Sequence, residues 1–194
     1  MDKDKFLNNV EDWENHAHLL WLALETTKTG DVLELGCGDG STPRMHEYCK
    51  DSNRMLYSFE TDAEWLKKFI VLEWRLHKFK RIINDWDKVK AEYPNPSVIL
   101  VDNAPGHSRA DIVKWFSDFN GIMVIHDTQP KPTAADYRFE TVWHYWKYKV
   151  DLQVDRNEES PNKDNRTWAS AVSNIYDVTK WAGIETGRDD YRIL

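Results

Sequence analysis

Two apolar runs of this chain end in residues that could move a proton. The first run ends in Asp102, and the loop after it carries His107 and Arg109. The second run ends directly in His126 and Asp127. Histidine titrates near neutral pH and serves as a general base, and a neighbouring aspartate can orient its ring. These residues predict a site that removes a proton from a substrate, with His126 as the first candidate base and His107 as the second.

A glycine-rich loop predicts that the same chain binds a polar or anionic ligand. Residues 31–42 read DVLELGCGDGST, an apolar strand followed by glycines at alternate positions and then by a Ser-Thr pair. Glycine lets the backbone turn sharply and approach a ligand closely. Ser41 or Thr42 can cap the next helix, whose free N–H groups suit an anionic or polar group. The segment is therefore typical of a strand, a ligand cradle and a helix.

The spacing of the glycines distinguishes between nucleotide-like ligands. The dinucleotide fingerprint Gly-x-Gly-x-x-Gly requires a third glycine at position 41, where this chain has Ser41. A phosphate-binding loop requires Gly-Lys-Ser/Thr, which does not occur in the sequence. An NAD-dependent oxidoreductase is therefore disfavoured, although a tight turn without any ligand would use the same glycines.

The run Glu34-Leu35-Gly36-Cys37-Gly38-Asp39-Gly40 resembles motif I of the class I S-adenosylmethionine (SAM)-dependent methyltransferases. The resemblance implies an α/β fold with a Rossmann-like, mostly parallel sheet, a C-terminal antiparallel strand pair and helices on both faces. It also implies that Glu34 organises the loop and its cofactor. The residues implied to bind SAM at this loop are Glu34, Gly36, Cys37, Gly38, Gly40, Ser41 and Thr42.

Later strand ends are consistent with the same cofactor. Glu60 ends a short apolar run, and an acid at the end of a second strand can accept both ribose hydroxyls. The alternative role for Glu60 is to cap the next helix. Thr61, the next residue in the chain, is also a predicted cofactor-binding residue. The resemblance implies that Asp85 lies near the adenine amino group, with Trp86 or a neighbouring residue over the ring. An exposed loop is the alternative for this pair. The resemblance also implies that Asp102 faces the transferred methyl group.

The pattern Asp-x-x-x-Gly-His-x-Arg, followed by His-Asp-Thr, looks like the small-molecule and sugar O-methyltransferase-like branch and like uncharacterised bacterial and phage methyltransferase-like proteins. This implies SAM as the cofactor, a small hydroxylated acceptor and a His/Asp general base. A divalent metal is not required, although Asp102, Asn103 and Asp127 could supply oxygen ligands. Two alternatives stay open: methylation of a protein or nucleic acid docked on the aromatic and basic segment 143–149, and a non-catalytic SAM-binding module.

Composition limits the class of protein. A chain of 194 residues with 41% hydrophobic and 30% charged residues predicts a single globular domain. The net charge of −7 argues against general phosphate attraction, so nucleic acid is not the expected partner. Two cysteines suggest no disulfide framework, and we expect a cytoplasmic protein. The apolar run 19–24 is too short to span a bilayer. The sequence leaves open whether the protein forms a homo-oligomer.

Alternating helices and strands must position these residues. Helices are predicted over residues 5–27, 41–53, 63–79, 109–119 and 137–147, and strands over 31–35, 56–60, 81–86, 97–102, 122–125, 148–154 and 168–175, with a polar loop at 155–166. Such alternation forms a parallel sheet that binds ligands beyond the carboxyl ends of its strands. Every polar cluster named above lies at such an end, which predicts one site at one rim.

The first predicted helix would form an N-terminal cap, residues 1–29, on a Rossmann-like core at 30–194. It carries Trp13 and His16, and in proteins of the family that motif I resembles this segment often covers the substrate pocket. The basic residues 77–81 are interpreted as the solvated end of the helix predicted over 63–79.

Overall fold

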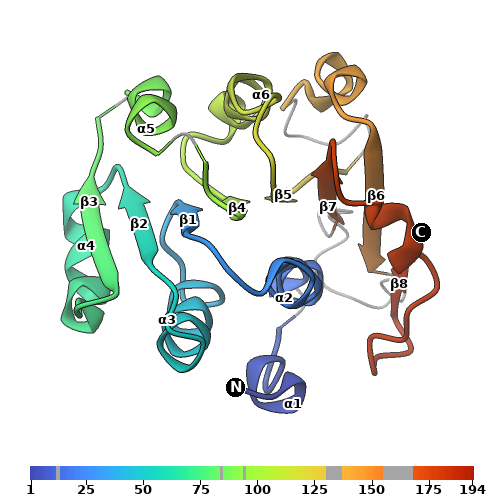
Figure 1. The fold of residues 1–194 in the computed structure, drawn as a ribbon, viewed down its shortest axis with the longest axis horizontal. Helices are drawn as coiled ribbons and strands as arrows, with labels where there is room; N and C mark the ends of the chain where they lie inside the picture. Colours follow the sequence, from blue (N-terminus) through green and yellow to red (C-terminus); the bar gives the residue numbers. More distant parts are fainter. Residues whose placement is uncertain (12–13, 84, 94, 130–136, 155–167) are drawn as a thin grey trace, which may run out of the picture.

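Eight strands form one sheet in the computed structural model of this chain (Figure 1). They are β1 (Val32–Leu35), β2 (Leu56–Glu60), β3 (His77–Arg81), β4 (Val98–Val101), β5 (Ile122–His126), β6 (Tyr148–Val154), β7 (Trp168–Ser173) and β8 (Tyr191–Ile193). The structure describes residues 1–11, 14–83, 85–93, 95–129, 137–154 and 168–194. The predicted loop at 155–166 and Trp13 therefore lie outside the described residues.

The strand order is β3-β2-β1-β4-β5-β7-β6-β8. The first five strands of this order pair in parallel, and β7 lies antiparallel between β5 and β6. The predicted parallel sheet with C-terminal antiparallel strands is thus confirmed. The short strand β8, which pairs antiparallel with β6, was not predicted, because three residues carry too little periodicity to be recognised.

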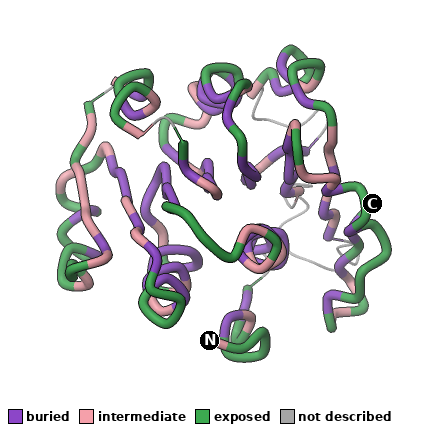
Figure 2. Tube along the Cα trace, viewed as in Figure 1, coloured by how far each residue is buried: buried purple, intermediate pink, exposed green. Residues whose placement is uncertain are grey.

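Helices cover both faces of the sheet (Figure 1). On one face lie α2 (His16–Thr27) and α3 (Thr42–Asp51), and on the other lie α5 (Trp86–Glu92) and α6 (Arg109–Trp115). Strand side chains alternate between the two cores: Leu100 packs on the α2 side, whereas Ile99 packs on the α6 side. Figure 2 shows the central strands buried between these layers, which explains why β4 is apolar at every position.

The predicted helix over residues 5–27 is wrong in extent. The structure has a short α1 (Lys3–Phe6) and then α2, which begins at His16. Between them Asn9 adopts a left-handed conformation with φ of 55°, which asparagine tolerates better than most residues and which ends a helix. The break matters because it lets the segment before α2 turn toward the glycine-rich loop.

The predicted helix over residues 63–79 and the strand over 81–86 are also corrected. Helix α4 (Ala63–Phe69) continues only into η2 (Ile70–Leu72), and β3 then occupies His77–Arg81 beside β2. The basic residues 77–81 are therefore an edge strand and not a helix end. Lysines are typical of edge strands because they discourage further pairing, but a strand so rich in charge has no apolar alternation to reveal it.

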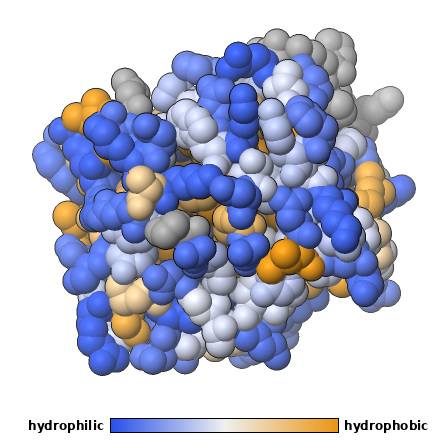
Figure 3. All heavy atoms as spheres, turned by 45° about the horizontal axis from the view of Figure 1, so that its top comes forward, coloured by the Kyte–Doolittle hydropathy of each residue, from blue (hydrophilic) through white to orange (hydrophobic). Residues whose placement is uncertain are grey.

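The helix predicted over 137–147 is replaced by two short 3₁₀ helices, η4 (Phe139–Thr141) and η5 (Trp143–Tyr145). Phe139, Val142 and Trp146 are buried in the core on the α6 side, so tertiary packing interrupts the helical periodicity. Within the described ranges, no helix combines the length and apolar character needed to cross a membrane. The face in Figure 3 is mostly hydrophilic, with apolar residues scattered over it.

Candidate active site

The glycine-rich loop packs tightly against its neighbours at two of its three glycines. Gly36 has a φ of +100°, and a Cβ there would lie 2.5 Å from the Asp102 carbonyl oxygen. A Cβ at Gly40 would lie 2.5 Å from Cγ of Glu14, in the segment before α2. At Gly38 it would meet only the Ser41 hydroxyl, at 3.5 Å. Gly36 is thus required by the fold and Gly40 by the N-terminal segment, while Gly38 leaves space for a ligand.

Glu34 organises this loop from beneath. Its side chain is fully buried, and Oε1 accepts hydrogen bonds from Ser41 Oγ at 2.7 Å and Thr42 Oγ1 at 2.9 Å, while Oε2 accepts one from Ser58 Oγ. Thr42 Oγ1 in turn accepts the Gly38 N–H at 2.9 Å. Ser41 occupies the position before α3 without a side-chain cap bond, so the predicted capping role of this hydroxyl is corrected. The two hydroxyls tie the loop to Glu34 instead.

Burial raises the pKa of Glu34 to about 7. Between an unfolded pKa of about 4.3 and this value, the folded protein keeps a proton that the unfolded chain releases, so stability falls as pH rises. Glu34→Gln should therefore flatten the pH dependence of the free energy of unfolding by about 2–3 kcal/mol between pH ~5 and ~8. Urea unfolding of both proteins at the two pH values measures this, and equal pH dependence in both would contradict the role of Glu34.

Glu60 connects the end of β2 to the glycine-rich loop. Its buried carboxylate accepts the Thr61 and Asp62 N–H groups on Oε1, at 2.6 and 2.9 Å, and the Cys37 N–H on Oε2, at 3.0 Å. The helix cap of α4 is Asp62, so Glu60 is not needed for that role. A carboxylate oxygen can accept two hydrogen bonds, and Oε2 therefore retains one position that suits a ribose hydroxyl.

The two residues predicted to lie near an adenine have different environments. Asp85 precedes α5 at the surface, and its carboxylate pairs with Lys88 at 2.7 Å. Trp86 is buried in the core on the α6 side together with Leu33 and Phe59. Trp86 is thus a core residue in this structure, while Asp85 remains accessible. Their predicted roles beside an adenine stay predictions.

Arg109 joins the ends of β4 and β5. Its guanidinium group, itself buried, lies 2.9 Å from Asp102 Oδ1 and 2.9 Å from Asp127 Oδ2, and it donates to the backbone carbonyl oxygens of Asn103 and His126. A buried cation held by two carboxylates stabilises their charged forms. Arg109 therefore holds the predicted Asp102, His126 and Asp127 together as one cluster.

His126 and Asp102 form a hydrogen-bonded pair within this cluster. His126 Nδ1 lies 3.0 Å from Asp102 Oδ1. Burial by itself would lower the pKa of His126, but Asp102 and then Asp127 raise it above its ordinary value. Burial would raise the pKa of Asp102, but His126 and Arg109 bring it below its ordinary value. With Nδ1–H directed at Asp102, the buried Nε2 presents its lone pair and has no hydrogen-bond partner among the described residues.

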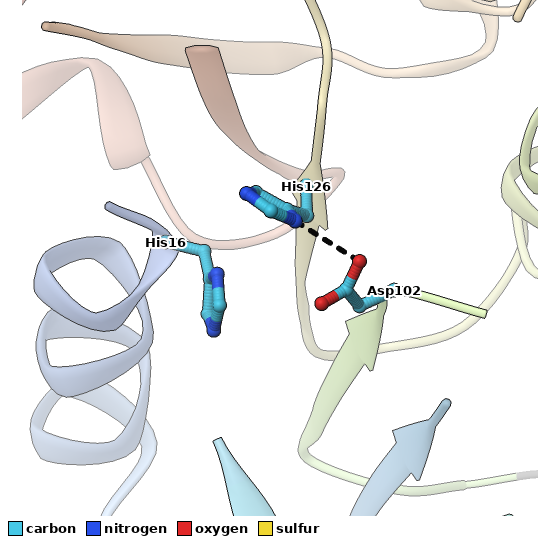
Figure 4. Close-up of side chains that lie close together, drawn as sticks. All are labelled: His16, Asp102 and His126. Atoms are coloured by element: carbon cyan, nitrogen blue, oxygen red, sulfur yellow. Dashed lines mark hydrogen bonds and ion pairs between the residues drawn. The ribbon is translucent and has the colours of Figure 1, made fainter. Parts of the chain in front are cut away.

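The predicted base His107 is not part of this cluster. It lies exposed on η3 (Gly106–Ser108), between Asp102 and Arg109 in the sequence. The structure instead brings His16 to the cluster, a histidine that the sequence analysis placed only on the predicted N-terminal cap helix. The ring of His16, at the start of α2, lies 4.7 Å from the ring of His126 between centroids (Figure 4). The sequence pointed to His16 only through its position on a segment that we expected to cover the substrate pocket.

Three side chains of this cluster lie close enough together to be considered as metal ligands. Ligand-type atoms of His16, Asp102 and His126 lie within 4.8 Å of one another. Two imidazoles and a carboxylate would suit a transition metal rather than magnesium. However, Asp102 Oδ1 is already contacted by His126 Nδ1 and by the Arg109 guanidinium, whose positive charge opposes a cation. The residues therefore fit a hydrogen-bonded site better than a metal centre.

Comparisons with known proteins identify the fold. No family model and no curated protein matches the sequence. A Klebsiella pneumoniae structure, provisionally assigned as an O-methyltransferase, aligns over 90% of this chain and 92% of its own, with 16% identity and a TM-score of 0.59. The O-methyltransferase from Bacillus cereus in complex with SAH aligns over 89% and 92%, with 13% identity and a TM-score of 0.59. An SAH-bound methyltransferase from Podospora anserina aligns over 81% and 76%, with 14% identity and a TM-score of 0.57.

This chain has the class I methyltransferase fold. The Rossmann-like fold predicted from motif I and the alternating elements is thereby confirmed. In this methyltransferase fold the glycine-rich loop follows β1, and the Asp102–His126 pair lies at the carboxyl ends of β4 and β5. The predicted division into a cap at 1–29 and a core at 30–194 stays a prediction.

Proposed function

We propose that this protein binds SAM and transfers its methyl group to a hydroxyl of a small acceptor, with His126 as the general base. The observation that carries the proposal is the pairing of His126 Nδ1 with Asp102 Oδ1 at 3.0 Å, which leaves Nε2, at the rim of the sheet, without a hydrogen-bond partner among the described residues. Two structures with the same fold support this reaction: the O-methyltransferase from Bacillus cereus and the Klebsiella pneumoniae protein provisionally assigned as one.

The residues of the loop fit SAM. The space at Gly38 and the remaining acceptor position on Glu60 Oε2 suit the amino acid part and the ribose of the cofactor, and Asp85 is accessible for its adenine. Two similar structures hold SAH, which supports SAM as the cofactor. When bound, SAM supplies an electrophilic methyl group on a sulfonium, so the protein needs only to align a nucleophile and remove its proton.

His126 performs the proton step in this proposal. Its neutral Nε2 takes the proton of the acceptor hydroxyl, and Asp102 orients the ring and stabilises the imidazolium that forms. Arg109 positions both Asp102 and Asp127 through contacts of 2.9 Å. Asp127 adds a second negative charge near the imidazolium, with Oδ1 3.7 Å from His126 Nε2.

The other proposals concern partners and location. A small-molecule acceptor is favoured over a macromolecule because Trp146 of the segment 143–149 is buried in the core, which leaves this segment a smaller aromatic surface for docking. The formal charge of −7 also disfavours nucleic acid. Cys37 and Cys49 are free and buried, which is consistent with a reducing cytoplasm.

Calorimetric titration with SAM, and separately with NAD, tests the cofactor. We expect micromolar SAM binding, about −8 kcal/mol, and Glu60→Ala should weaken it at least tenfold because the ribose loses its acceptor and Cys37 N–H loses its partner. Glu64→Ala is the matched control, since Glu64 is an exposed glutamate on α4 whose carboxylate pairs with Lys67 at the surface. Binding of NAD without SAM, or equal SAM affinity in the Glu60 variant, would refute the proposal.

A further inference from the structure

We infer that His16 is an acceptor-binding residue, which holds a second hydroxyl of an uncharged, polyhydroxylated acceptor while His126 deprotonates the first. This inference rests on the proposed function and adds a residue from α2 to its site. Figure 4 shows the His16 side chain, from α2, converging with those of His126 and Asp102, from the ends of β5 and β4.

The first support is that His16 is buried without hydrogen bonds. Its exposed fraction is 2%, and neither ring nitrogen has a hydrogen-bond partner among the described residues. A buried polar group without a partner costs free energy, so such groups in folded proteins are normally satisfied by protein, water or ligand. His126 Nε2, in the adjacent ring, is unsatisfied in the same way. Two neighbouring imidazoles that each have a nitrogen without a hydrogen-bond partner in the described part of the chain indicate a ligand that contacts both rings.

The second support is that His16 remains an uncharged donor and acceptor. Burial, followed by the nearby His126, lowers its pKa to about 3. Neutral imidazole has one N–H donor and one nitrogen acceptor, which together match a hydroxyl group. His16 therefore gains and loses no proton in the reaction. The proton passes from the acceptor hydroxyl to His126 Nε2, the new O–C bond forms, and the S–C bond to the methyl group breaks.

The third support is that the segment before His16 is fixed in place. Glu14 Oε2 accepts a hydrogen bond from the Arg44 guanidinium at 3.0 Å, and the Glu14 side chain fills the space beside Gly40. Arg44 also donates to the backbone carbonyl oxygens of Phe6 and Asn8, at 2.6 and 2.9 Å. This anchorage on α3 fixes a segment in which Glu14 contacts the glycine-rich loop and His16 contacts His126, so that one segment reaches both halves of the site.

The charges of the cluster favour an uncharged acceptor. Asp102 and Asp127 are both near His126, and Arg109 is the cation that they share. With His126 neutral, these groups leave a net negative charge, which would repel a carboxylate or phosphate on the acceptor. A neutral polyol can instead place one hydroxyl against His126 and a second against His16.

Calorimetry with defined probes tests the inference without requiring turnover. Methyl glucoside and catechol serve as neutral probes, gluconate as the anionic counterpart, each titrated into protein saturated with SAH. We expect at least one neutral probe to bind, gluconate to bind at least tenfold more weakly than methyl glucoside, and His16→Phe to weaken neutral-probe binding at least tenfold. His16→Gln, which keeps a donor and an acceptor, should restore most of the affinity.

The matched control is His18→Phe. His18 lies on the same helix and is equally buried, but its ring packs against Tyr191 on the other side of α2. This variant should leave probe binding unchanged, and a thermal melt of each variant shows whether it folds. The inference is overturned if no neutral probe binds the wild-type protein, or if His16→Phe binds the probes as tightly as the wild type. A failure of SAM itself to bind would instead refute the proposed function.

Discussion

Replacing His126 by alanine is expected to lower kcat for methyl transfer by about 10²–10⁴-fold, the usual contribution of a positioned general base. The side chain is buried and paired with Asp102, but it makes none of the contacts of the glycine-rich loop, so the affinity for SAM should change little. Transfer of a radiolabelled methyl group from SAM, together with calorimetry of cofactor binding, measures both quantities in the same preparation.

The pH profile distinguishes a base from a merely structural residue. His126 must be neutral to accept a proton, and its pKa is raised above 6.5 by Asp102 and Asp127 in spite of burial. In the wild type, kcat/KM should therefore rise with pH through a pKa above 6.5. Asp102→Asn removes one of these charges and should move this limb to lower pH. A greater loss of kcat in His107→Ala than in His126→Ala would show that the base is assigned to the wrong histidine.

Replacing Gly36 by alanine is expected to destabilise the protein by about 3 kcal/mol or more. The residue has a φ of +100°, and the added Cβ would lie 2.5 and 2.6 Å from backbone atoms of Asp102 and Asn103. Backbone atoms at the end of a buried strand cannot move aside as a flexible side chain can. Urea unfolding measures the loss, and because β1 would shift away from β4, the variant should also bind SAM poorly.

Gly38→Ala is the matched control for this prediction. A Cβ at Gly38 meets only Ser41 Oγ at an ordinary contact distance of 3.5 Å, so the free energy of unfolding should stay within about 0.5 kcal/mol of the wild type. Its expected effect is on SAM affinity alone. A Gly36→Ala protein as stable as the wild type would contradict the structural role assigned to this glycine.

The sequence by itself determined the fold class and the location of the site. The apolar run that became β4 is buried on both faces, and such a run between helices is typical of a parallel sheet. The glycines after β1 marked the cradle, and Asp102 and His126 marked two further strand ends. These inferences succeed because they depend on local properties: periodicity over a few residues, the freedom of glycine, and the rule that parallel strands end at one rim.

Only the tertiary structure decided which side chains meet there. The charged strand β3 became recognisable only through its pairing with β2, and the break at Asn9 only through the packing of the N-terminal segment. His16 and His126 lie far apart in the sequence, yet their rings come within 4.7 Å between centroids, while His107 stays outside the cluster. The physical reason is that such contacts depend on how α2 packs across β5 and β7, and no local pattern in the chain encodes that long-range packing.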